Sequence, residues 1–151
     1  MQVSKSPGKT KLLNYFEINK NFYIVDLPGY GFAKVSHSEK NLWKKMIENY
    51  LLKSDELKLV LTLTDVRHGP QKSDLALIEW LEHNKIPFYV IATKTDKLSK
   101  TKLQKNLNSF YKNQHIIKNK FLPYSSVTKQ GREELLQIIG EVLSSYQMSD
   151  V

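Results

Sequence analysis

The sequence predicts an α/β fold, with a doubly wound, mostly parallel sheet and helices on both faces. Apolar runs typical of buried strands alternate four times with segments whose apolar residues recur at helical spacing. Polar motifs follow three of the strand-like runs, at residues 26–29, 93–96 and 125–127. Since open α/β sheets bind ligands at the carboxyl ends of their strands, we expect these three motifs to form the ligand site.

The expected elements follow from these patterns in chain order. Residues 12–18 and 22–26 predict an antiparallel hairpin, because the short connection Asn19-Lys20-Asn21 joins them. Ser38 followed by Glu39 predicts a helix start, and helical spacing extends it over about 38–53. The remaining elements are a buried parallel strand at 57–64, a helix at about 72–84, a buried strand at 88–93, a lysine-rich helix at about 99–111, a short strand at 121–124 and a helix at 132–146.

Composition predicts a single globular domain, residues 1–151. A chain of 151 residues can bury a core, and its hydrophobic content of 40% and charged content of 25% are ordinary for a soluble protein. No apolar run approaches the roughly 20 residues of a membrane span, and the polar residues 1–11 contain no secretory signal. The lack of cysteine excludes disulfides, thiolate metal sites and cysteine nucleophiles, and fits a cytoplasmic protein.

The segment around Asp26 predicts a phosphate and Mg²⁺ contact. Asp26 ends an apolar run, and a carboxylate at a strand end can hold Mg²⁺ beside a phosphate, usually through water. Pro28 and Gly29 stop the strand and let backbone N–H groups approach a ligand. By itself the pattern Asp-x-x-Gly is more often a structural turn than a phosphate site.

The motif Gly8-Lys9-Thr10 is similar to the end of a P-loop, Gly-x-x-x-x-Gly-Lys-Ser/Thr. Val3 occupies the position of the first glycine, and a strand-like run follows where a P-loop opens a helix. The residues by themselves therefore do not predict a phosphate cradle here.

The motif Thr93-Lys94-Thr95-Asp96 predicts a guanine site at the end of a strand. The Asp96 carboxylate can accept hydrogen bonds from guanine N1–H and the exocyclic amine, whereas adenine would leave the charge unpaired. The aliphatic stem of Lys94 can cover the face of the base. After the next strand, backbone N–H groups of residues 125–127 can meet guanine O6. A solvated turn is the alternative interpretation of each motif.

The chain carries a net charge of +8, which favours a polyanionic partner. Much of the excess gathers around the lysine-rich helix, at Lys94, Lys97, Lys100, Lys102, Lys105, Lys112, Lys118 and Lys120. Lys34 and Arg67 can join this group. Such a surface suits the phosphates of RNA, and we expect Lys100, Lys102 and Lys105 to contact them. A merely solvated helix face is the alternative.

These motifs together resemble the EngB (YihA/YsxC) family of ribosome-assembly GTPases, in the translation-factor-like class of P-loop GTPases. The resemblance extends from about residue 4 to residue 143. It is carried by Ser6-Pro-Gly-Lys-Thr10 with Asn14, Asp26-Leu-Pro-Gly-Tyr-Gly-Phe-Ala-Lys34, Asp65-Val-Arg-His-Gly-Pro70, Ile86-Pro87, Thr93-Lys-Thr-Asp96 and Tyr124-Ser-Ser126. It implies a three-layer, Ras-like P-loop GTPase fold and binding of GTP or GDP with Mg²⁺.

The resemblance also implies roles for individual residues. Thr10 and Asp26 are the expected Mg²⁺ ligands, and Thr10 and Gly29 sense the γ-phosphate. The implied nucleotide contacts are Gly8, Lys9, Thr10, Lys11, Leu12, Asp26, Leu27, Pro28, Gly29, Thr93, Lys94, Thr95, Asp96, Ser125, Ser126 and Val127. Tyr30 stands where many small GTPases place the glutamine that orients water, so no catalytic residue is assigned.

Compared with the family, residues 1–151 are expected to lack the first strand, the P-loop and the first helix. The missing strand would lie between the strands at 22–26 and 57–65. Without the P-loop, which supplies most phosphate contacts, we expect weak GTP binding and negligible hydrolysis.

Two functions stay open at this point. The first, implied by the resemblance, is a GTPase that acts in assembly of the large ribosomal subunit and is needed for cell division and septation. It is expected to be a monomeric cytoplasmic protein with no membrane partner. The second is a nucleotide-independent RNA- or ribosome-binding protein, or an inactive truncated fragment.

Overall fold

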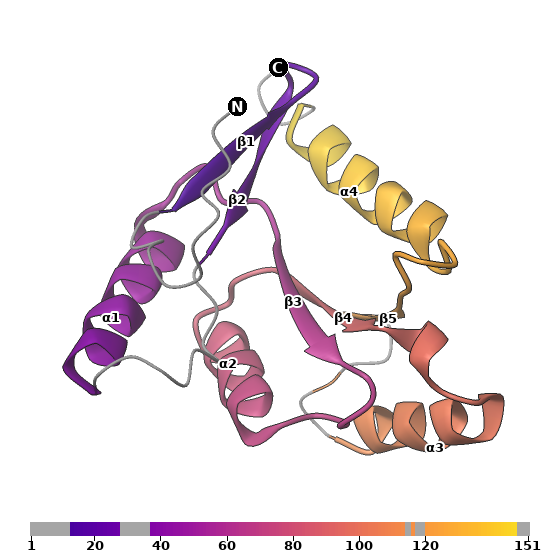
Figure 1. Ribbon diagram of the computed structural model, residues 1–151. Coiled ribbons are helices and arrows are strands. Elements are labelled where there is room, and N and C mark those ends of the chain that lie inside the picture. The colour runs from indigo at the N-terminus through magenta and orange to yellow at the C-terminus, as the bar shows by residue number, and fades with distance from the viewer. Residues whose placement is uncertain (1–12, 28–36, 114–115, 117–119, 148–151) are drawn as a thin grey trace, which may run out of the picture. The chain divides into compact units, whose positions relative to one another are not determined.

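The computed structural model describes residues 13–27, 37–113, 116 and 120–147 (Figure 1). Two compact units divide the chain, Met1–Ser54 and Asp55–Val151, which we call unit 1 and unit 2. The expectation of a single domain over residues 1–151 stays a prediction. Among the described helices, none combines the length and the apolar character that crossing a membrane requires.

Unit 1 contains the predicted hairpin and the first helix. Strands β1 (Asn14–Ile18) and β2 (Phe22–Asp26) pair antiparallel, with Asn14 opposite Asp26. The backbone is left-handed at Asn19 and Lys20, with φ of 52° and 55°, which matches the twist that tight hairpins require. Helix α1 (His37–Lys53) follows. The hairpin prediction is therefore confirmed.

Unit 2 contains a parallel sheet of three described strands, in the order β3-β4-β5. The strands are β3 (Val60–Asp65), β4 (Phe88–Thr93) and β5 (Phe121–Pro123), and the helices of the unit are α2 (Lys72–His83), α3 (Lys100–Tyr111) and α4 (Arg132–Gln147). Asp65 pairs with Thr93, and Ala92 pairs with Pro123. The carboxyl ends of all three strands consequently meet at one edge of the sheet.

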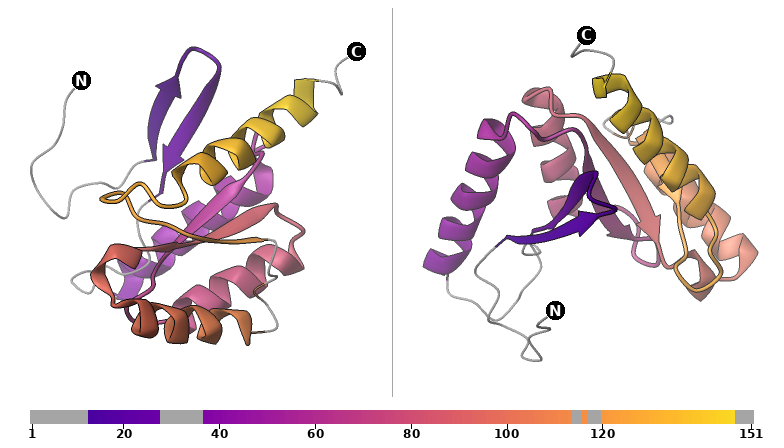
Figure 2. Two further views of the ribbon diagram at one scale, coloured as in Figure 1. Left: turned by 90° about the vertical axis from the view of Figure 1, so that its right-hand side faces the viewer. Right: turned by 90° about the horizontal axis from the view of Figure 1, so that it is seen from above.

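The sheet of unit 2 lies between helices on both faces, with α2 and α3 on one face and α4 on the other (Figure 2). Strand β4 is central, and its residues Val90, Ile91 and Ala92 are buried. Its run of consecutive apolar residues is what a strand covered on both faces requires. The ring of Phe110 in α3 packs against that of Phe121 in β5, with centroids 5.1 Å apart.

Some predicted boundaries and burial were wrong. Strand β3 begins at Val60, three residues later than expected, and the side chain of Leu63 within it is 70% exposed. The apolar run predicted a buried strand, but within the described residues β3 pairs on one side only, with β4. Strand β5 ends at Pro123, one residue earlier than expected. The sequence also did not predict the short 3₁₀ helix η1 (Thr95–Lys97).

The turn into α4 depends on Gly131, whose φ is +76°. A Cβ at this position would lie 2.3 Å from the carbonyl oxygen of Pro123, at the end of β5. We therefore predict that Gly131→Ala lowers the free energy of unfolding by about 1 kcal/mol or more, measured by urea denaturation.

Gly140, within α4, is the matched control. A Cβ there meets no atom within 4 Å, so Gly140→Ala should raise the free energy of unfolding by about 0.5–1 kcal/mol through helix propensity. Equal effects of the two substitutions would contradict the assigned close approach of Gly131 to β5.

Candidate functional site

The candidate site lies at the carboxyl edge of the sheet in unit 2, where two loops meet. The first loop follows β4 and contains Lys94 and Asp96, and the second follows β5 and contains Ser125. Parallel pairing continues past the strands, because Tyr124 N–H donates to Ala92 O at 2.8 Å and Thr95 N–H donates to Tyr124 O at 3.3 Å. The two loops are therefore held side by side by backbone hydrogen bonds.

The hydroxyl of Ser125 joins the loops through side chains. It donates to Asp96 Oδ1 at 2.7 Å and accepts the N–H groups of Val127 at 3.2 Å and Thr128 at 3.1 Å. The two N–H groups occupy both lone pairs of the serine oxygen, and its single proton is donated to Asp96. Ser125 is fully buried, so this arrangement is shielded from solvent.

Asp96 presents a carboxylate at this edge. Its side chain is only 10% exposed, and Lys97 Nζ lies 3.4 Å from Oδ2. The hydrogen bond from Ser125, helped by Lys97 and opposed by burial, holds the pKa of Asp96 below its usual range. Asp96 is therefore ionised at neutral pH, the state in which it accepts hydrogen bonds and cannot donate one.

Thr95 and Gln130 form a second connection between the loops. Thr95 Oγ1 donates to Gln130 Oε1 at 2.7 Å, and Gln130 O accepts the N–H of Ser125 at 3.0 Å. Thr95 is buried at 2% exposure, so this bond lies beneath the surface that Asp96 presents. The two loops are therefore joined through Gln130 as well as through Ser125.

Lys94 contacts the end of the neighbouring strand β3. Its Nζ donates to Asp65 Oδ2 at 2.8 Å, while Arg67 binds both oxygens of the same carboxylate. The Arg67 hydrogen bonds, with Lys94, hold the pKa of Asp65 well below its usual range despite partial burial. Lys94 has φ of 63° and ψ of 34°, a left-handed backbone that costs a lysine on the order of 1 kcal/mol.

Of the remaining predicted contacts in unit 2, Thr93 has a structural partner, because its Oγ1 donates to Thr64 O at 2.8 Å. Ser126 and Val127 are exposed and follow Ser125 in the loop after β5. The Val127 N–H, which we expected to reach guanine O6, donates to Ser125 Oγ in this structure.

In unit 1, Asp26 ends β2 with an exposed side chain, and Leu27 follows it half-buried. Gly8, Lys9, Thr10, Lys11, Leu12, Pro28 and Gly29 lie outside the described residues. The predicted phosphate and Mg²⁺ contacts therefore stay predictions. Within the described part of the chain, no group of three or more His, Cys, Asp or Glu side chains is arranged to hold a metal ion.

The sequence interpretation did not assign a role in the site to Asp65 or Gln130. It placed Arg67 with the basic surface, whereas Arg67 is paired with Asp65. One signal was available: Asp65 ends an apolar run next to a parallel strand, as Asp26 does. Gln130 carried no such signal, because its partner Thr95 is 35 residues away.

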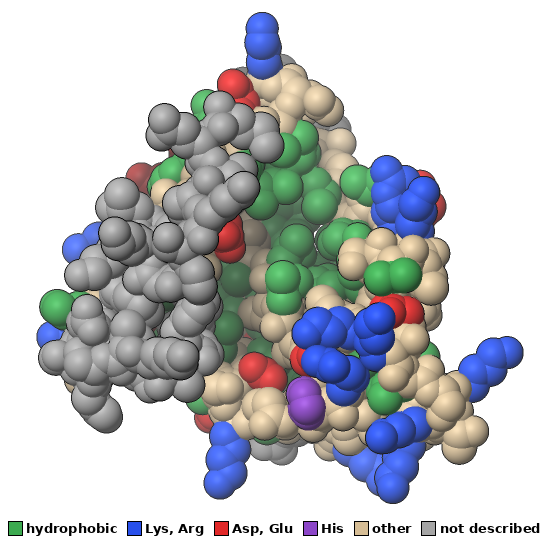
Figure 3. Space-filling model, viewed as in Figure 1, with side chains coloured by type: hydrophobic (Ala, Val, Ile, Leu, Met, Phe, Trp, Pro, Cys, Tyr) green, Lys and Arg blue, Asp and Glu red, His purple; other side chains and the backbone are tan. Residues whose placement is uncertain are grey.

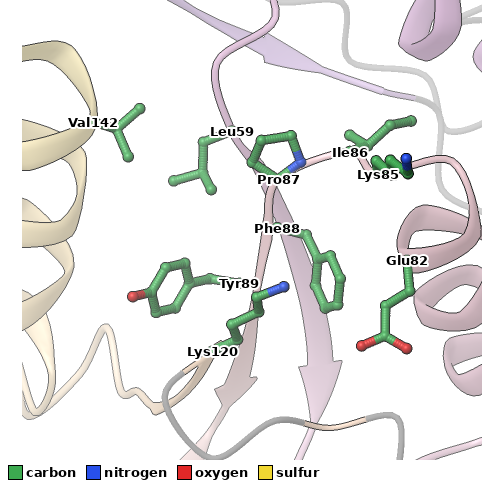
Figure 4. A pocket seen from close by; sticks show the side chains of 9 residues that line it. All are labelled: Leu59, Glu82, Lys85, Ile86, Pro87, Phe88, Tyr89, Lys120 and Val142. Atoms are coloured by element: carbon green, nitrogen blue, oxygen red, sulfur yellow. The ribbon is translucent and has the colours of Figure 1, made fainter. Parts of the chain in front are cut away.

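A separate, largely apolar hollow lies at the amino ends of β3 and β4 (Figure 4). Leu59, Pro87 and Phe88 contribute to its wall, with Val142 from α4. Asp96 and Ser125 follow the opposite, carboxyl ends of the strands and do not line this hollow. It is therefore distinct from the candidate site.

Removal of the Ser125 hydroxyl tests the connection between the loops. Ser125→Ala leaves the N–H groups of Val127 and Thr128 without their acceptor and Asp96 without its donor. We predict a loss of about 1–3 kcal/mol in the free energy of unfolding, measured by urea denaturation. Ser126→Ala, an exposed neighbour, is the control and should change this free energy by less than about 0.5 kcal/mol. Similar small changes in both variants would contradict the assignment.

Known GTP-binding proteins are similar in sequence to this chain. Residues 1–94 match the model of the family described as 50S ribosome-binding GTPase. The chain is similar to the probable GTP-binding protein EngB of Clostridium kluyveri, with 44% identity over 97% of this chain and 75% of that protein. It is 46% identical to the corresponding protein of Clostridium botulinum strain Alaska E43, over 89% of this chain and 69% of that protein.

Solved structures show the same fold. A crystal structure of a probable GTP-binding protein EngB matches with a TM-score of 0.75 and 20% identity, over 89% of this chain and 84% of that one. The structure of Era in complex with MgGDPNP and part of 16S ribosomal RNA matches with a TM-score of 0.59 and 20% identity, over 91% and 46% of the two chains. The fold is the α/β fold of P-loop GTPases, as the sequence predicted, and the chain belongs to the EngB family of GTP-binding proteins.

Proposed function

We propose that this protein binds GTP and GDP, and that Asp96 recognises the guanine base. We further propose that it acts in the cytoplasm in assembly of the large ribosomal subunit. In this role it would be a monomeric G domain that is needed for normal cell division. The observation that carries the nucleotide site is the Asp96 carboxylate, ionised, nearly buried and oriented by Ser125. Guanine offers two adjacent donors to such a group. Adenine offers an acceptor in place of one donor, and would leave the carboxylate incompletely paired.

Neighbouring groups complete the proposed base site. The aliphatic part of Lys94 covers one face of the ring, and Ser125, Ser126 and Val127 close the pocket. Thr93 and Thr95 contribute through the backbone that they hold in place. All of these residues belong to unit 2, where backbone hydrogen bonds join the two loops that carry them.

The proposed phosphate and Mg²⁺ contacts lie in unit 1. Asp26 supplies a carboxylate oxygen, the type of ligand that Mg²⁺ prefers, at the end of β2. Thr10 would be the second ligand. Leu27, Pro28 and Gly29 would follow the γ-phosphate, with residues 8–12 beside the nucleotide. When bound, Mg²⁺ would neutralise the negative charge of the nucleotide phosphates.

The first turn of α3 supports the RNA part of the proposal. Lys100 and Lys102 lie in this turn, where a positive charge is unfavourable by about 0.3–1 kcal/mol each because of the helix dipole. They and Lys105 are exposed, and none of the three takes part in the ion pairs found among the described residues. Lysine and arginine side chains gather over the α3 end of unit 2 (Figure 3). Such a surface suits phosphates of ribosomal RNA.

A change at Asp96 tests the base site. In Asp96→Asn, the Ser125 hydroxyl donates to the amide oxygen, because it has no free acceptor position for the NH₂ group. The NH₂ group consequently faces the base. A donor then meets the donors of guanine, at a cost of about 1–3 kcal/mol in GTP binding, and XTP should become the better ligand. Titration with fluorescent nucleotides measures both affinities. Unchanged GTP binding without a gain for XTP would contradict the proposed role.

Charge reversal on α3 tests the RNA surface. Lys100→Glu, Lys102→Glu and Lys105→Glu together should weaken binding to large-subunit RNA and reduce its log–log salt slope by about 1 per lysine. The first two changes should also stabilise the protein slightly, because acidic residues suit the first turn. Opposite signs for stability and binding exclude unfolding as the cause.

The control for this experiment reverses three exposed lysines of unit 1 for which the described residues give no ion pair, Lys20, Lys45 and Lys53. It changes the net charge equally, so RNA binding should fall much less if the α3 surface is specific. Equal losses of RNA affinity in both triple variants would show that the α3 lysines act only through the net charge of the protein. RNA binding that is insensitive to GTP and GDP would favour the nucleotide-independent alternative.

A further inference from the structure

The carboxylate of Asp65 is saturated by three groups at the end of β3. Arg67 Nε and backbone N–H donate to Oδ1 at 2.9 and 3.0 Å, and Arg67 Nη2 donates to Oδ2 at 2.7 Å. Lys94 Nζ occupies the remaining position on Oδ2 at 2.8 Å. Arg67 therefore fixes the direction of the carboxylate, and the carboxylate in turn fixes the ammonium of Lys94.

The loop that carries Arg67 is anchored independently of Asp65. Asn106 of α3 donates through Nδ2 to the carbonyl oxygens of Val66 at 2.8 Å and Arg67 at 3.3 Å. Val66 is fully buried, and its N–H donates to Thr93 O at 3.1 Å. Removing the charge of Asp65 should consequently release Lys94 without unfolding this loop.

Lys94 is the one member of this cluster that belongs to the proposed base site. Lys94 precedes Asp96 by two residues in the chain. Its side chain extends from the end of β4 to Asp65 at the end of β3. Lysine is otherwise among the most flexible side chains, and 52% of this one is exposed. An anchored ammonium therefore holds the aliphatic stem in one place before a base arrives.

We propose that Asp65, clamped by Arg67, is a positioning residue for nucleotide binding that holds the stem of Lys94 in place as a platform for the face of the base. This inference rests on the proposed function. It assigns Asp65 and Arg67 a role in nucleotide binding that does not depend on their contacting the nucleotide. The side chain of Asp65 is 22% exposed, so its ion pairs with Arg67 and Lys94 are partly shielded from water. We expect the cluster to affect ligand affinity in addition to stability.

A double-mutant cycle with GDP tests the positioning role. Asp65→Asn frees Lys94, and Lys94→Met keeps an apolar stem but removes the ammonium. Asp65→Asn should weaken GDP binding roughly threefold to tenfold, the cost of ordering one long side chain. In the Lys94→Met background, Asp65→Asn should have no further effect. Asp55→Asn, the same change at an exposed site in unit 2, is the control and should leave binding unchanged.

Two further measurements separate positioning from a structural role. In the Asp96→Asn background, Asp65→Asn should weaken XDP binding by the same factor as it weakens GDP binding in the wild type, since a platform for the ring face does not read the base edge. The methylene carbon next to Lys94 Nζ, observed by NMR without nucleotide, should become as mobile as that of an unpaired lysine. Arg67→Gln should produce both effects to a smaller degree.

The possible outcomes distinguish this inference from the proposed function. Equal losses of GDP affinity in the wild-type and Lys94→Met backgrounds, or an unchanged mobility of Lys94, would overturn the positioning role while guanine binding stands. A wild-type protein that binds neither GDP nor GTP in an NMR titration would overturn the proposed function, and the positioning role with it.

Discussion

The candidate site depends on the parallel pairing of β4 with both of its neighbours. This pairing brings the ends of three strands to one edge, so that Asp65 meets Lys94 and Asp96 meets Ser125, although the residues of each pair are 29 positions apart in the chain. Backbone hydrogen bonds from Thr95 to Tyr124 extend the alignment beyond the strands. Because the edge consists of strand ends fixed by a buried core, the polar groups there do not need a ligand to assemble them.

The hydrogen bonds at this edge of the sheet fix the orientation of the two acidic side chains, Asp96 and Asp65. The two acceptor positions of Ser125 are filled by backbone N–H groups, so its proton has a single destination, Asp96. The carboxylate of Asp65 is filled in a similar way by Arg67, and Lys94 takes the position that remains. Both acidic groups are therefore ionised and oriented, one toward the loop that follows β5 and the other toward Lys94. A preorganised site of this kind reduces the entropy that a ligand must overcome.

Local patterns predicted most of the fold, while the connections within the site came from the tertiary structure. The hairpin, the four helices and the strands of unit 2 were predictable because periodicity and turn residues act over a few positions. The start of β3 and the exposure of Leu63 were not, because an apolar run does not state how many neighbours a strand has. Asp96 and Ser125 were predictable as motif residues. Their mutual hydrogen bond, and the Thr95–Gln130 bond, depend on loop geometry that the sequence pattern does not encode.

The measurement that tests the central claim most directly is an NMR titration of the isotopically labelled protein with GDP and, in parallel, with ADP. If Asp96 reads guanine, GDP should shift the backbone amide signals of Thr95, Asp96, Val127 and Thr128, which lie around the Asp96–Ser125 hydrogen bond. ADP at the same concentrations should leave these signals in place. Equal shifts with both nucleotides, or shifts confined to other parts of unit 2, would contradict the claim that this edge of the sheet is a guanine site.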